Sequence, residues 1–158
     1  MPLADVIAAH PFLQGMKPEH LALLTQNAMF ASFKQQEWIF REDEPANRFY
    51  LIRAGQVALE ANVQDRGRLL IETIGPGNVL GWSWLFPPFY WRFDARAVTP
   101  VEAIFFYGTR LRTDCEADRE FGYELLKRMT KVVVERLQSE RSRLVRLAEH
   151  GQIQTSND

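Results

Sequence analysis

The sequence predicts a single α+β domain that is mainly β, in which an antiparallel sandwich or barrel lies between short helices and a long C-terminal helix. Between residues 30 and 107, short β-branched and aromatic runs alternate with turn formers about every eight to twelve residues. On both sides of this region, apolar residues recur at helical spacing. The chain has 158 residues, 46% of them hydrophobic, which suits one compact domain and excludes two large ones.

Two short helices are predicted before the β region. The first covers the apolar residues 3–9. In the second, Pro18 suits a first helical turn, and Leu21, Leu24 and Ala28 recur at helical spacing.

Seven strands are predicted in the central region from their composition and from the turns that bound them. The turn segments are rich in residues that favour tight turns or positive φ, and they cover residues 44–47, 54–55, 64–67 and 75–77. The predicted strands are residues 29–33, 37–40, 48–53, 56–63, 69–74, 93–98 and 101–107.

A short helical piece from Thr109 to about Glu116 and a long helix from Asp118 to Glu149 are predicted next, the long one about 40 Å in length. The long helix carries a heptad-like seam, which indicates a homodimer formed through this helix. The alternative is an amphipathic helix packed on its own barrel. We expect residues 1–150 to form the domain and the polar residues 151–158 to be a disordered tail. The seam consists of Leu126, Thr130, Val133, Leu137, Glu140, Leu144 and Leu147.

Charge and cysteine content limit the classes of function. Nineteen Lys and Arg against twenty Asp and Glu give a formal charge of −1, so no global field would hold a polyanion or an anionic membrane. The single Cys115 cannot form an intrachain disulfide, which suits a reducing compartment. The chain has no apolar run of 18 residues, and its start lacks the features of a signal peptide. We therefore expect a cytoplasmic protein without a membrane partner.

The sequence motifs give little support for a catalytic site or a metal site. The Gly81-Trp-Ser83 segment lacks the second glycine of a nucleophile elbow. His10, His20 and His150 are too scattered for a metal site. We expect neither an enzyme nor a metalloprotein.

Several separated motifs, in order, resemble the cyclic-nucleotide-binding domain of the catabolite activator/FNR (Crp-like) bacterial regulators. They are HPFLQGMKPEHL at residues 10–21, IFREDEPANRFYLIRAGQV at 39–57, IGPGNVLG at 74–81 and ARAVTPVEA at 95–103, followed by the long helix. The resemblance implies a double-stranded β-helix, or jelly-roll barrel, that holds a cyclic nucleotide and repositions the helix after it. About ten residues follow that helix, too few for the family's helix-turn-helix. We therefore expect a sensor that does not bind DNA directly and signals to a separate, unidentified protein partner.

The phosphate-binding cassette departs from the family pattern. The family places a Glu for the ribose after its first glycine and an Arg for the cyclic phosphate about ten residues later. Here Trp82 follows Gly81, and an indole accepts no hydrogen bond. Arg92 lies at the expected distance but one residue too close to Ala97, so strand alternation could turn it outward, and Arg96 is a second candidate. The resemblance suggests a cyclic nucleotide or cyclic dinucleotide as ligand, and these departures disfavour cyclic AMP.

The cassette is rich in aromatic residues, which leaves two interpretations open. The rings could fill the cavity and make the domain a ligand-free structural or interaction module. Alternatively, they could stack on a planar base or enclose a flatter, more apolar ligand. The candidate ligand-binding residues are Gly81, Trp82, Ser83, Trp84, Arg92, Arg96 and Glu140.

Glu140 is the one acid in the apolar seam. It falls where, by the resemblance, the helix reaches the base of the nucleotide. A carboxylate there could accept from the N1–H and amine of a guanine, whereas it would face the acceptor N1 of an adenine. The alternative is that Glu140 pairs with Arg136, Arg141 or Arg143 and fixes the helix register.

Overall fold

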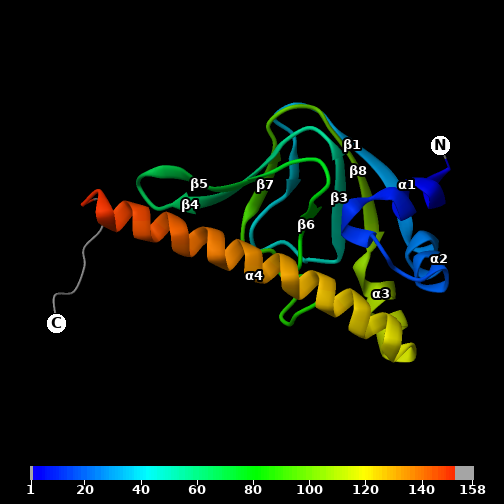
Figure 1. The fold of residues 1–158 in the computed structure, drawn as a ribbon. Helices are drawn as coiled ribbons and strands as arrows, with labels where there is room; N and C mark the ends of the chain where they lie inside the picture. Colours follow the sequence, from blue (N-terminus) through cyan, green and yellow to red (C-terminus); the bar gives the residue numbers. More distant parts are fainter. Residues whose placement is uncertain (1, 152–158) are drawn as a thin grey trace, which may run out of the picture.

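The computed structural model describes residues 2–151 and contains two four-stranded sheets that close into a jelly-roll barrel (Figure 1). Every strand pair is antiparallel. One sheet has the order β1 (Ala28–Phe33), β8 (Val101–Tyr107), β3 (Arg48–Ala54) and β6 (Val79–Leu80). The other has the order β2 (Trp38–Phe40), β7 (Asp94–Ala97), β4 (Val57–Val63) and β5 (Gly67–Ile74). The predicted fold class is confirmed.

Helices cover the outer side of the β1-β8-β3-β6 sheet, and one long helix runs along the barrel (Figure 1). The N-terminal helices are α1 (Leu3–Ala9), the short 3-10 helix η1 (Pro11–Leu13) and α2 (Pro18–Gln26). The C-terminal ones are α3 (Gly108–Ala117) and α4 (Arg119–Glu149). No helix within residues 2–151 is long and apolar enough to cross a membrane. The expected tail, residues 151–158, lies outside the described residues except for Gly151.

Strand β3 separates two hydrophobic cores. Its side chains alternate between the two faces of the sheet. Phe49 and Leu51 pack into the core beneath the helices, whereas Tyr50 and Ile52 pack into the barrel interior. Alternate residues of β3 therefore belong to the barrel interior and to the core beneath the helices.

The long helix α4 is held against the rest of the domain by arginine side chains. Asp118 caps its start by accepting from the backbone N–H of Phe121 at 3.1 Å. Farther along, guanidinium groups donate to backbone carbonyls: Arg128 to Phe12 at 2.8 Å and Arg143 to Ile71 at 2.6 Å. The second contact covers part of the edge of β5, which would otherwise present unpaired carbonyls.

All seven predicted strands are present, with bounds that differ by at most two residues. Two elements were not predicted, β6 and η1, and they have only two and three residues. The turn glycine Gly55 has φ of +91°, and a Cβ there would lie 2.2 Å from the carbonyl oxygen of Pro100. This close approach requires glycine.

Candidate ligand-binding site

The cassette begins where β6 ends, at Gly81, and an indole ring lies against it. A Cβ on Gly81 would lie 2.8 Å from the ring of Trp91, so only glycine fits. Trp91 is 5% exposed and stacks on Phe40, with ring centroids 3.8 Å apart and planes 7° from parallel. The space left beside Gly81, Trp82 and Ser83 is only about 10 Å³. The Trp91 ring therefore fills this part of the barrel.

The register around Arg92 follows from strand alternation. Trp91, Ala95 and Ala97 belong to the barrel core. Arg92 is one residue out of phase with them and is exposed. It is one of the residues that line the small space beside Gly81. The inward position next to Arg92 is thus held by the indole of Trp91.

Arg96 lies on the outer face of the β2-β7-β4-β5 sheet. Its Nε donates to Oε1 of Glu60 at 2.8 Å, and its guanidinium also contacts the side-chain oxygen of Gln36. Ala95 and Ala97, on either side of it, point into the barrel. Arg96 is therefore separated from the barrel interior by the sheet itself.

Asp94 is part of the same outer face. Its Oδ1 accepts from the backbone N–H of Glu42 at 2.7 Å, and its carboxylate pairs with Arg41 and Arg68. Burial alone would raise the pKa of Asp94, but these hydrogen bonds and charges outweigh burial and lower it. Asp94 is thus an ionised anchor of the outer face.

The remaining candidate residues of the cassette separate into two groups. Trp84 is fully buried and stacks on Phe49 at 5.0 Å, in the core beneath the helices and away from the barrel interior. Ser83 is buried beside Gly81. Trp82 is half-buried and borders both the small space at Gly81 and a larger cavity. The structure brings Trp82 together with Gly81 and Ser83, but not with Trp84.

The larger cavity, which we name the Trp82 cavity, has a volume of about 210 Å³. It lies between Trp82, the inner side of β4 and β5, and helix α4. Glu140 contributes to its wall and is thereby close to Trp82. The residues that line it are Leu59, Ile71, Glu72, Trp82, Phe93, Val133, Arg136, Leu137 and Glu140.

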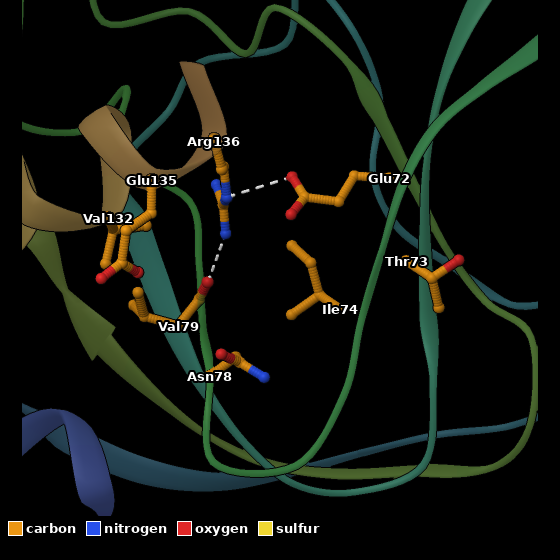
Figure 2. A pocket seen from close by; sticks show the side chains of 8 residues that line it. All are labelled: Glu72, Thr73, Ile74, Asn78, Val79, Val132, Glu135 and Arg136. Atoms are coloured by element: carbon orange, nitrogen blue, oxygen red, sulfur yellow. Dashed lines mark hydrogen bonds and ion pairs between the residues drawn. The ribbon is translucent and has the colours of Figure 1, made fainter. Parts of the chain in front are cut away.

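Arg136 reaches from α4 into the barrel, between β5 and β6 (Figure 2). It donates to the carbonyl of Val79 at 2.5 Å, and its Nε lies 3.5 Å from Oε2 of Glu72. Burial raises the pKa of Glu72 and the charge of Glu140 raises it further, while Arg136 opposes both. A second cavity, of about 130 Å³, is also lined by Glu72 and Arg136 and extends to Asn78 (Figure 2).

The sequence analysis did not select Trp91, Phe40, Glu72 or Arg136 as site residues. For Arg136 a signal existed, because it lies four residues before Glu140 and so shares its helix face. Among the described residues, no basic side chain lies within 4.0 Å of the Glu140 carboxylate. Within the single chain, the alternative pairing of Glu140 with Arg136, Arg141 or Arg143 is therefore not formed.

The comparisons with known proteins agree on one family. The cyclic nucleotide-binding domain model matches residues 30–118. A CRP-like cAMP-activated global transcriptional regulator from Mycobacterium tuberculosis is 27% identical over 143 residues, which are 90% of this chain and 62% of the relative. The chain thus spans about three-fifths of the length of this curated relative.

Solved structures show the same fold. A protein from Geobacter metallireducens, described as cyclic nucleotide-binding, has a TM-score of 0.77 and 26% identity over 87% of this chain and 99% of its own. A cyclic nucleotide-binding domain from Methylobacillus flagellatus has a TM-score of 0.81 over 98% of this chain and 85% of its own; at 14% identity, it supports the fold alone. Because the family model covers more than half of the sequence, the chain belongs to the cyclic nucleotide-binding domain family.

Proposed function

We propose that this chain is a cytoplasmic regulatory domain, not an enzyme, whose barrel does not take the cyclic phosphate of a nucleotide and which signals through α4 to a separate protein partner. One observation carries the proposal: the Trp91 ring lies against Gly81 and stacks on Phe40, where the cassette would hold the phosphate. The M. tuberculosis relative is a transcriptional regulator, which supports a regulatory role.

The chemistry of the cassette argues against cyclic AMP. Charge-assisted hydrogen bonds from a guanidinium contribute about 1.5–3 kcal/mol each. The indole of Trp91 carries no charge, and Arg92 is exposed. Arg136, the other cation that borders the space beside Gly81, already contacts the Val79 carbonyl and the Glu72 carboxylate. Trp82 offers no acceptor to a ribose hydroxyl. We expect cyclic AMP to bind weakly or not at all.

A homodimer through α4 is part of the proposal. Leu126, Leu137 and Leu144 of the seam are 41%, 68% and 55% exposed in the single chain. They form one stripe, on a side of the helix different from the buried Leu125 and Met129. Burying a leucine contributes about 1.5–3 kcal/mol before the cost of association, so a second copy of α4 along this stripe would be stabilising.

The alternative function is a ligand-free interaction module. The same stack of Trp91 on Phe40 favours it, because these rings make the cassette part of the core. The Trp82 cavity favours a sensor, because it remains open beside α4. In a sensor, the ligand shifts the equilibrium between two arrangements of α4. The free energy of this shift cannot exceed the difference in the ligand's binding free energy between the two arrangements.

Native mass spectrometry of the protein purified from its own source tests this proposal, followed by thermal shift with cyclic mono- and dinucleotides. We expect the mass of a dimer without a cyclic nucleotide, and no thermal shift. A ligand at one hundred times its dissociation constant adds about 2.7 kcal/mol to stability, which such a scan detects. A co-purified cyclic nucleotide, or a saturable shift with one, would contradict the proposal.

A further inference from the structure

We infer that the Trp82 cavity binds a small, flat, positively charged or N–H-rich aromatic molecule that carries no phosphate. This inference rests on the proposed function, because it takes the phosphate subsite beside Gly81 to be closed. It differs from cyclic nucleotide binding in the anchoring groups, which are carboxylates, and in the size of the ligand.

The size and lining of the cavity set the shape of the ligand. About 210 Å³ is less than the roughly 300–1,000 Å³ of pockets for drug-sized molecules, so one or two rings fit. Leu59, Val133 and Leu137 give apolar walls, and Trp82 and Phe93 add aromatic ones. Aromatic walls favour a planar ligand, since rings pack by offset stacking or edge to face.

The polar groups of the cavity set its charge preference. Arg136, the one cation among them, already contacts the Val79 carbonyl and the Glu72 carboxylate. Glu140 has no cationic partner among the described residues, and Glu72 holds Arg136 only at 3.5 Å. An ionised carboxylate can only accept hydrogen bonds. The cavity therefore has two carboxylates and only one guanidinium, which already has partners. This balance attracts a ligand that donates hydrogen bonds or carries positive charge, and it repels an anionic ligand.

The aromatic lining supports the same preference. The face of a tryptophan ring attracts a cation, most strongly where water is excluded. The half-buried Trp82 lies on the same cavity as Glu140 and Glu72. An amidinium or protonated ring nitrogen could thus meet both a carboxylate and an aromatic face.

Calorimetry with benzamidine, benzamide and benzoate tests the inference, because these three share one ring and differ in charge. We expect benzamidine to bind best and benzoate at least tenfold more weakly. Glu140→Gln, which keeps the shape of the side chain, should weaken benzamidine at least tenfold. Glu149→Gln is the matched control, because Glu149 is exposed on the last turn of the same helix and does not line the cavity.

Three results would overturn the inference: no benzamidine binding at about 1 mM, benzoate binding as tight as benzamidine binding, or equal losses in the Glu140 and Glu149 variants. Circular dichroism and sedimentation of each variant show whether it is folded with its oligomeric state unchanged. Titration of the same sample with cyclic AMP separates this inference from the proposed function. Tight cyclic AMP binding refutes the proposed function, whereas failure of benzamidine alone refutes only the inference.

Discussion

Replacing Trp91 with alanine is expected to destabilise the domain strongly, because the ring is a packed part of the barrel core. It is 5% exposed, and it stacks on Phe40 at 3.8 Å between ring centroids. Truncating a buried tryptophan to alanine costs about 3–5 kcal/mol. For a domain of 158 residues, this lowers the midpoint of thermal unfolding by about 6–20 °C.

Urea unfolding followed by circular dichroism measures this loss. Tyr90→Ala is the matched control: Tyr90 is adjacent in sequence but 47% exposed, and its truncation should change the free energy of unfolding by about 0.5 kcal/mol or less. A cost below about 1 kcal/mol for Trp91→Ala would refute the reasoning. It would mean that the ring leaves the barrel easily and that the phosphate subsite is accessible.

Three further predictions concern the dimer and the pH dependence of stability. Leu137→Asp together with Leu144→Asp should give a monomer in sedimentation, and a surviving dimer would place the interface elsewhere. Burial lowers the pKa of His10 below 6.5, although its bond to the Ile52 carbonyl opposes this. The unfolded chain then takes up a proton first, so stability should fall as pH drops below about 6.5; an equally steep fall in His10→Gln would contradict this. Asp94→Asn should cost about 2 kcal/mol at pH 7. Since the folded pKa of Asp94 lies below 3.8, this difference should shrink as pH falls through it, and a constant difference in acid would disprove the role of the ionised carboxylate.

The fold was predictable because its strands are long enough to show alternation and its turns carry glycine, proline and asparagine. Strand β3 shows this, since Phe49 and Leu51 face one core while Tyr50 and Ile52 face the other. Strand β6 has only two residues, which is too short for any period to appear. It exists because its neighbour β3 pairs with it, and a pairing between distant segments leaves no local pattern.

The candidate site was predictable in part. From the family resemblance, the sequence analysis expected Trp82 in place of a carboxylate and a disturbed register at Arg92. Whether Trp91 or Arg92 points into the barrel depends on where the strand begins. The structure places the Trp91 side chain in the barrel interior. The pairing of Arg136 with Glu72 joins residues far apart in the chain, so only the docking of α4 on β5 reveals it.

Calorimetric titration of the purified protein with cyclic AMP tests the central claim most directly. The Trp91 ring and a cyclic phosphate cannot both lie against Gly81, where a single added carbon would already approach the ring to 2.8 Å. We predict no measurable binding heat at cyclic AMP concentrations up to about 1 mM. A saturable heat with a dissociation constant of the order of 1 μM would contradict the account, because the ring would then have to leave the barrel at little cost.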